Sequence, residues 1–288
     1  MSGSPDTGLS AGGPDRAFAR LREGLLHYRH AGAATGARPL WMMHASPASS
    51  RSLETLLAAV AATRRAIAPD TPGYGDSAPL DVARPEVSDY ADAMLRALDA
   101  LGIERTDLYG YHTGAHIAIE MAIARPDRVG GVVLDGLLWL DDADRDDFLA
   151  HYAPPLLPDA AGTQVLRALQ FIRDQAWFFP HFRRDAAHNL GAGAMPPELL
   201  HGLTVELLKA ASTYHLGYNA VFRHRLEERL PRLRAPVLLL ADQGDPTRHA
   251  IPRAAALLPG SRTAMPGEAW SPAGAAAKAA LIGGFLDG

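Results

Sequence analysis

The chain has 288 residues, of which 48% are hydrophobic, a formal net charge of −4 at pH 7 and no cysteine. This balance gives no reason to expect nucleic acid or a membrane surface as a partner, and the lack of cysteine excludes disulfides, thiol catalysis and thiolate metal sites. No stretch approaches the roughly 20 apolar residues of a membrane span. Residues 1–15 are polar and rich in Gly, Ser and Pro, without a signal-peptide pattern. We expect a flexible tail over residues 1–20 and a cytoplasmic protein.

The first half of the chain alternates between predicted strands and helices. Apolar or β-forming runs predict strands at 24–30, 39–43, 65–68, 106–109 and 129–134. Helical patterns lie between them, at about 49–63, at 88–101 with Ser88 as the cap, and from about 113 to the residues before Arg125-Pro126. Strands that alternate with helices favour an α/β fold with a parallel sheet and right-handed crossovers.

The pattern changes in the second half. From about 137 to 229 there is no strand alternation, and helical periodicity at 163–175, 197–211 and 212–229 predicts an all-helical insertion, which we interpret as a lid. The run 236–241 resumes the sheet, and a helix (252–258), a short strand (262–265) and a closing helix (272–286) follow. The predicted domains are a core of 21–138 and 230–288 and a helical cap of 139–229.

The chain is organised around Gly110-Tyr111-His112-Thr113-Gly114, which lies between a predicted strand and a predicted helix. Glycines two before and two after a central residue suit a sharp turn, because they allow strained backbone angles and let strand and helix approach closely. The turn exposes His112 at the carboxyl end of a strand, where open α/β sheets bind their ligands.

Two other loops accompany this turn: His44-Ala45-Ser46-Pro47 and Asp70-Thr71-Pro72-Gly73-Tyr74-Gly75-Asp76-Ser77. The three motifs occur in the order seen in the α/β-hydrolase superfamily. From about residue 25 onward the chain resembles its capped branch, which includes lipid and lactone esterases, C–C bond hydrolases, epoxide hydrolases and dehalogenases. The resemblance implies a mostly parallel twisted sheet flanked by helices, with a helical lid. Ala45 departs from the family, which usually has Gly there.

The resemblance also implies an oxyanion hole formed by the backbone N–H groups of Ser46 and Thr113. The nucleophile position holds His112, where the family has Ser, Cys or Asp. Imidazole can act as a general base or acid near neutral pH, or attack an acyl carbon itself. The acid that orients it follows one of two strands, as Asp135 or as Asp245, and the sequence leaves both open.

A second family hallmark is missing, because no histidine follows His249. Glu268 or Trp270 occupies the approximate place of the usual catalytic histidine. His116 lies one helical turn after His112, but nothing in the spacing requires a zinc site, so we expect no metal and no cofactor.

Aromatic and histidine side chains in the lid and loops are candidates for an apolar pocket, although such residues more often pack a lid on its core. His44 has an alternative role as a structural histidine that bonds the backbone near the oxyanion loop. The candidate pocket residues are His44, Trp139, Trp177, Tyr214, His215 and Trp270.

These observations favour a small-molecule enzyme with an apolar or aromatic substrate. Its reaction is ester or lactone hydrolysis by water, or proton abstraction beside a carbonyl that leads to elimination, isomerisation, decarboxylation or cyclisation, as in tailoring enzymes of secondary metabolism. Two alternatives stay open: a non-catalytic ligand-binding homologue, and a conventional esterase with Ser46 or Ser271 as its nucleophile. A homodimer also stays open.

Overall fold

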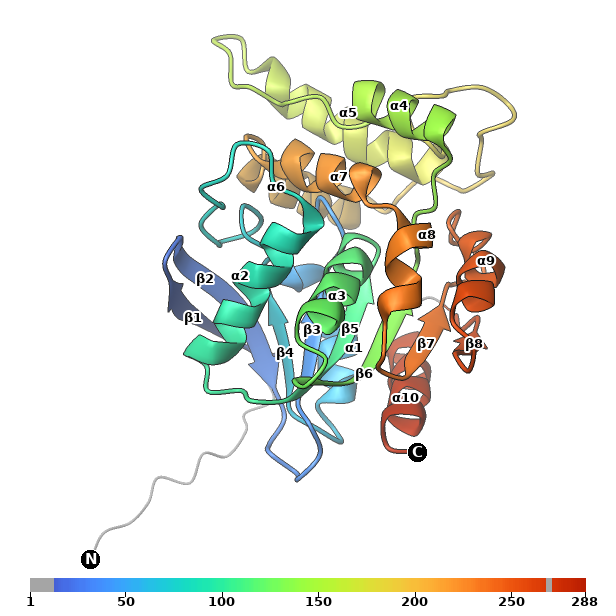
Figure 1. The fold of residues 1–288 in the computed structure, drawn as a ribbon. Helices are drawn as coiled ribbons and strands as arrows, with labels where there is room; N and C mark the ends of the chain where they lie inside the picture. Colours follow the sequence, from blue (N-terminus) through green and yellow to red (C-terminus); the bar gives the residue numbers. More distant parts are fainter. Residues whose placement is uncertain (1–12, 268–270) are drawn as a thin grey trace, which may run out of the picture.

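The computed structural model describes residues 13–267 and 271–288 (Figure 1). Within these ranges eight strands form one sheet in the order β1-β2-β4-β3-β5-β6-β7-β8. The strands are β1 Asp15–Leu21, β2 Gly24–Ala31, β3 Leu40–Met43, β4 Ala66–Pro69, β5 Thr106–Tyr111, β6 Val129–Asp135, β7 Val237–Leu240 and β8 Arg262–Ala264. β2 is antiparallel to both its neighbours, and the remaining pairs are parallel. The predicted α/β sheet, mostly parallel, is confirmed.

Helices cover both faces of the sheet. In chain order they are α1 Glu54–Val60, α2 Val87–Ala100, α3 Thr113–Ala124, α4 Asp142–His151, α5 Thr163–Trp177, α6 Pro197–Lys209, α7 Tyr214–Arg223, α8 Leu226–Arg229, α9 Ala250–Leu257 and α10 Pro272–Leu286, with short 3₁₀ turns at Ser50–Leu53 and Leu230–Arg232. α2 and α3 pack together on one face, and α1 and α10 on the other (Figure 1).

The pleat of β3 shows how the core is built. Trp41 and Met43 belong to the apolar cluster beneath α2 and α3, whereas Leu40 and Met42 belong to the cluster beneath α1 and α10. All four side chains are fully buried. Because successive strand residues point to opposite faces, a strand that is covered on both sides reads as a continuous apolar run.

Helices α4 to α7 lie over the carboxyl ends of the parallel strands (Figure 1). They enclose an apolar cluster of their own, in which Phe148, Tyr152, Phe171 and Phe222 make edge-on or stacked ring contacts. The predicted helical insertion is therefore present. None of the helices in the described ranges combines the length and the apolar character needed to cross a bilayer.

The structure corrects the sequence analysis at the N-terminal side. Residues 15–20, assigned above to a flexible tail, form most of the edge strand β1, which pairs with β2 from Asp15↔His30 to Leu21↔Gly24. The strand escaped prediction because most of its residues face solvent and its arginines break the apolar pattern, as is usual at sheet edges. Residues 1–12 lie outside the described ranges.

Three helix predictions also change. α2 begins at Val87, and Glu86 caps it in a reciprocal arrangement with Asp89, so Ser88 is not the cap. α4 lies within the predicted helical insertion, at a position where no individual helix was predicted. The predicted helix 212–229 breaks into α7 and α8 because the backbone at His224 and Arg225 is extended.

Candidate active site

The turn after β5 is an elbow in which strand and helix are separated by His112 alone. His112 has φ 47°, and it is the only described residue other than glycine with a positive φ. A Cβ at Gly110 would lie 2.2 Å from the Gly114 oxygen, and one at Gly114 would lie 2.2 Å from the Met43 oxygen. The two glycines therefore permit the close approach that presents His112. Backbone strain held by such packing is characteristic of functional sites.

Asp245 is the carboxylate that faces His112. Its Oδ2 lies 2.9 Å from His112 Nε2, within ion-pair distance, although the N–H direction leaves this oxygen without a linear hydrogen bond. Its Oδ1 accepts from both the backbone N–H and the hydroxyl of Thr247, each at 2.7 Å. Thr247 thereby fixes the orientation of the carboxylate toward the imidazole.

The surroundings of this pair shift the pKa values of His112 and Asp245 in opposite directions. Burial lowers the pKa of His112, but the Asp245 carboxylate, followed by those of Asp135 and Asp242, raises it, and the resulting pKa lies above the ordinary value. Burial raises the pKa of Asp245, whereas His112 and the Thr247 bonds bring it down to about 2. Asp245 therefore stays ionised near neutral pH and supports a proton on His112.

The second candidate acid, Asp135, is engaged elsewhere. It is fully buried, and its Oδ2 accepts from Tyr109 Oη at 2.7 Å and from Lys278 Nζ at 2.8 Å. Lys278, which α10 brings into the core, also lies 2.8 Å from Asp242 Oδ1. Asp135 binds His112 through its backbone oxygen, which accepts from His112 N–H at 2.9 Å. The structure thus pairs His112 with Asp245 and not with the Asp135 side chain.

The two predicted oxyanion donors are not equivalent. Thr113 N–H belongs to the first turn of α3, where no intrahelical acceptor is available. Ser46 N–H already donates to Thr113 Oγ1 at 3.2 Å. The Thr113 hydroxyl has no acceptor among the described residues. Thr113 therefore offers two donors next to His112, its N–H and its hydroxyl, whereas the N–H of Ser46 is already engaged.

A cavity of about 300 Å³ lies between the elbow and the helical insertion. His112, with 27% of its side chain exposed, lines it together with Thr113 and Ser46. Most of the remaining wall is apolar and includes Leu138, Ile172, Phe179, Leu203, Val221 and Phe222. The site therefore combines a polar floor with an apolar chamber, which is the usual build of a small-molecule site.

Five of the predicted pocket residues, His44 among them, lie outside this lining. Trp139 packs under Arg253, and Trp177 under Arg173, so Leu138 and Ala176 face the cavity in their place. The buried Tyr214 lies one turn before Tyr218, which does line the cavity, and His215 is also absent from the wall. The errors arise because neighbouring residues of a helix or loop face different directions.

His44 is structural. It is buried, its Nδ1–H donates to the Ala45 oxygen and its Nε2 accepts from Thr71 N–H, both at 2.9 Å. Burial lowers the pKa of His44, which keeps the ring neutral in this arrangement. It belongs to the loops beneath the cavity and does not line it. The predicted positions Glu268 and Trp270 lie outside the described residues.

Neither candidate serine is adjacent to an imidazole base. Ser46 Oγ donates to Tyr74 Oη at 2.8 Å, and Ser271 Oγ accepts from Gly274 N–H as the cap of α10. The structure offers no support for a conventional serine esterase.

His116 also turns away from His112. It is fully buried, and its Nδ1 lies 2.9 Å from Nδ1 of His224, whose Nε2 contacts Glu120 at 2.8 Å. This contact joins α3 to the break between α7 and α8.

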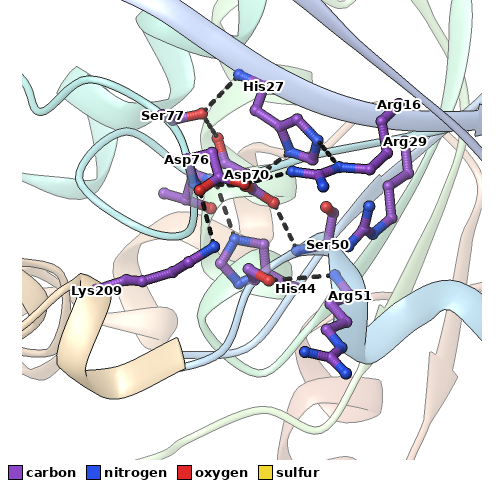
Figure 2. Close-up of polar contacts among 12 residues, drawn as sticks. Arg16, His27, Arg29, His44, Ser50, Arg51, Asp70, Asp76, Ser77 and Lys209 are labelled. Carbon is purple, nitrogen blue, oxygen red and sulfur yellow. Dashed lines mark hydrogen bonds and ion pairs between the residues drawn. The ribbon is translucent and has the colours of Figure 1, made fainter. Parts of the chain in front are cut away.

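One group of side chains in the described ranges has metal-ligand spacing: His27, Asp70 and Asp76. Arg16 donates to His27 and to Asp76, and Lys209 donates to Asp76 (Figure 2). Asp76 already binds two cationic side chains, and Asp70 accepts from the backbone N–H groups of Ser50 and Asp76 and lies 2.9 Å from His27 Nδ1, so the group is built as a hydrogen-bond and ion-pair network.

The sequence analysis did not single out several residues that contribute to the site. Thr247 could have been found from the Asp-Pro-Thr turn, because Asp side chains often accept from the backbone two residues on. Gln175 and Lys278 carry no comparable local signal, since only the tertiary fold brings them to the cavity or the core.

Comparison with known proteins is consistent with this geometry. The sequence profile of the family described as alpha/beta hydrolase fold matches residues 38–266. Among curated proteins, a 2-hydroxy-6-oxononadienedioate/2-hydroxy-6-oxononatrienedioate hydrolase of Pseudomonas putida is 43% identical over 131 residues, covering 41% of this chain and 44% of that protein. One with the corresponding name from Paraburkholderia xenovorans is 39% identical, covering 41% and 43%. The chain thus matches under half the length of these relatives.

Solved structures match almost the whole chain at low identity. An epoxide hydrolase from an endophytic Streptomyces has a TM-score of 0.73 at 20% identity and covers 96% of both chains. The enol-lactonase of Burkholderia xenovorans LB400 has a TM-score of 0.67 at 18% identity and covers 94% of this chain and 100% of its own. At such identities the likeness establishes the fold alone.

Proposed function

The chain belongs to the α/β-hydrolase fold family, and from that premise we propose that it is a small-molecule hydrolase with His112 as its general base. Its substrate is an apolar or aromatic compound, and water attacks the carbonyl carbon of an ester or lactone. The observation that carries the proposal is the contact of His112 with Asp245 beside an apolar cavity. The hydrolase names of the curated relatives support the same reaction class.

In the proposed reaction the Nε2–H of His112 faces Asp245, which leaves Nδ1 as the base. Nδ1 has no hydrogen-bond partner among the described residues, although the side chain lines the cavity. Nδ1 takes a proton from water as the water oxygen bonds to the carbonyl carbon. Asp245 stabilises the imidazolium that forms, and this pairing supplies the role of the third member of a triad.

The negative charge that develops on the carbonyl oxygen is met by Thr113, through its backbone N–H and its hydroxyl. When the tetrahedral intermediate collapses, the bond to the leaving oxygen breaks and that oxygen takes the proton from Nδ1. The products are the acid and the alcohol, and His112 returns to its neutral form. Donors fixed in a water-poor site are usually the largest contribution to such catalysis.

The test is hydrolysis of a panel of apolar esters and lactones in ¹⁸O-labelled water, comparing the wild type with His112→Ala. We expect the acid product of the wild type to carry one oxygen from water, and the variant to lose about 100-fold or more in kcat/KM. Rapid quenching and mass spectrometry should find no acyl group on the chain. An acyl-His112 adduct would instead make His112 the nucleophile.

The proton-abstraction alternative predicts exchange of the hydrogens beside a carbonyl with deuterated water and no incorporation of ¹⁸O. Unchanged turnover in His112→Ala would remove the proposal. Ligand binding without turnover of any kind would favour the non-catalytic homologue.

A further inference from the structure

The walls of the cavity identify the class of molecule that it accepts. Among the described residues that line it, the ionisable side chains are His112 and the three tyrosines Tyr111, Tyr152 and Tyr218. Burial raises the pKa of Tyr152 and Tyr218 far above the ordinary value, so their hydroxyls remain neutral. The positive charge of a protonated His112 is balanced by Asp245. The lining is therefore neutral as a whole.

Such a wall is unfavourable for an anion. A carboxylate that leaves water for an apolar cavity loses its hydration, and only a paired cation or several donors compensate for that loss. The names of the two curated relatives describe dioate substrates, which carry two carboxylates. The described lining of this cavity contains no arginine or lysine that would pair with either.

Besides these tyrosine hydroxyls, the insertion contributes the neutral carboxamide of Gln175 on α5. Its Oε1 lies 3.4 Å from the hydroxyls of both Tyr152 and Tyr218. Tyr218 in turn donates to the Ser46 oxygen at 2.8 Å. Gln175 thus lies beside the tyrosine that binds the Ser46 loop, while its Nε2 amide has no partner among the described residues.

We propose that the cavity binds an uncharged, mostly apolar carbonyl compound, and that Gln175 donates a hydrogen bond to a second neutral oxygen on it. The first oxygen lies at Thr113 and His112, which is the part that rests on the proposed function. Gln175 is then the specificity-determining residue of the insertion. A substrate with a second uncharged oxygen can use both sets of donors, and a dicarboxylate fits neither the charge nor the wall.

The test is calorimetric binding of three probes: benzylacetone, its isosteric carboxylate hydrocinnamate, and benzoylacetone, which adds a second carbonyl. For the wild type we expect hydrocinnamate to bind about 100-fold more weakly than benzylacetone. The same preference is expected in His112→Ala, because the apolar wall and not the imidazole imposes it.

The role of Gln175 is tested with Gln175→Leu. The affinity for benzoylacetone should fall about 3- to 10-fold, the range of one lost hydrogen bond, and that for benzylacetone should stay unchanged. Gln164→Leu is the matched control, since Gln164 lies on the same helix but outside the cavity lining. It should leave all three affinities unchanged.

Binding of hydrocinnamate as tight as that of benzylacetone would overturn the neutral-substrate inference, and so would failure of both neutral probes to bind. Equal losses for both ketones in Gln175→Leu, or none, would overturn the role of Gln175. These outcomes need no turnover. They are therefore distinct from failure of the proposed function, which shows as unchanged catalysis in His112→Ala.

Discussion

His112 with Asp245 and His27 with Asp70 both place an imidazole nitrogen 2.9 Å from a carboxylate oxygen. The surroundings of the two pairs differ. The side chains of His27 and Asp70 are 1% and 2% exposed, and the second ring nitrogen of His27 accepts from Arg16 at 2.9 Å. His112 is 27% exposed to a cavity, and its second nitrogen has no partner among the described residues. The unpartnered nitrogen and the cavity are therefore what distinguish the pair that we propose to be catalytic from the buried one.

The His27–Asp70 pair holds a loop. Asp70 Oδ1 accepts from Ser50 N–H at 2.8 Å, and its Oδ2 accepts from Asp76 N–H at 2.9 Å (Figure 2). Ser77 Oγ donates to the backbone oxygen of Asp70 and accepts from the backbone N–H of His27. Burial raises the pKa of Asp70, but these partners hold it well below the ordinary range. The cluster therefore ties β2, the end of β4 and the Asp70–Ser77 loop together.

The largest expected effect is a loss of activity when the His112–Asp245 pair, and not the His27–Asp70 pair, is disrupted. His112→Ala should lower kcat/KM by about 10² to 10⁴, the usual contribution of a general base, and change the free energy of unfolding by less than about 1 kcal/mol. Steady-state kinetics and urea unfolding measure the two quantities. A variant with full activity, or one that is unfolded, would contradict the assignment.

The converse expectation concerns stability. Asp70→Asn should lower the free energy of unfolding by about 3 kcal/mol, because it removes one partner of a buried charge-assisted network. The kcat of the folded fraction should remain within a few-fold of the wild type. Asp127→Asn, on an exposed carboxylate, is the matched control and should leave unfolding almost unchanged. A loss of activity at full stability would move Asp70 into the catalytic site.

The pH dependence gives a smaller effect. Because the pKa of His112 is raised, the rate should increase with pH through a midpoint above about 6.5, as the base form appears. Asp245→Asn should move that midpoint down, since it removes the largest of the contributions that raise the pKa. The pH–rate profiles of the wild type and of Asp245→Asn provide the measurement. An unmoved midpoint would exclude Asp245 as the partner of His112.

The same linkage acts on folding with a defined sign. A raised folded-state pKa means that the protonated His112 stabilises the fold below the unfolded-state pKa, near 6.5, and that this contribution is lost as pH rises through the folded value. The lowered pKa of Asp245 acts in the opposite direction, and its contribution is lost as pH falls toward about 2. Urea unfolding across pH, with His112→Ala as the reference, separates the two.

The smallest effect is expected at the solvent side of the His27 cluster. Lys209→Met should lower the free energy of unfolding by less than about 1 kcal/mol, because the ion pair of Lys209 with Asp76 is more than a third exposed on the lysine side. Thermal unfolding at low and high salt measures it. A loss as large as that of Asp70→Asn would show that the network depends on its exposed cations.

Much of the fold could be predicted because its signals are local. The apolar run of β3, the elbow glycines and the order of strands and helices depend on neighbouring residues, and each lies where it was expected. The edge strand β1 and the break at His224 could not be predicted in this way. β1 lacks an apolar pattern, and His224 lies at an extended break where its ring contacts residues of α3 that are distant in sequence.

The sequence by itself determined that a histidine stands at a strained elbow, because only the glycine frame around it is needed to see that. Tertiary structure decided which acid serves it. In the sequence, Asp135 and Asp245 are both aspartates that follow strands. In the structure, Lys278 of the last helix binds Asp135, and Thr247 orients Asp245 toward His112. It also decided which lid residues face the cavity, since one position along a helix rotates a side chain by about 100°. The local geometry of the elbow exposes the imidazole of His112, and contacts between residues far apart in the sequence determine which carboxylate it meets and which side chains line its cavity.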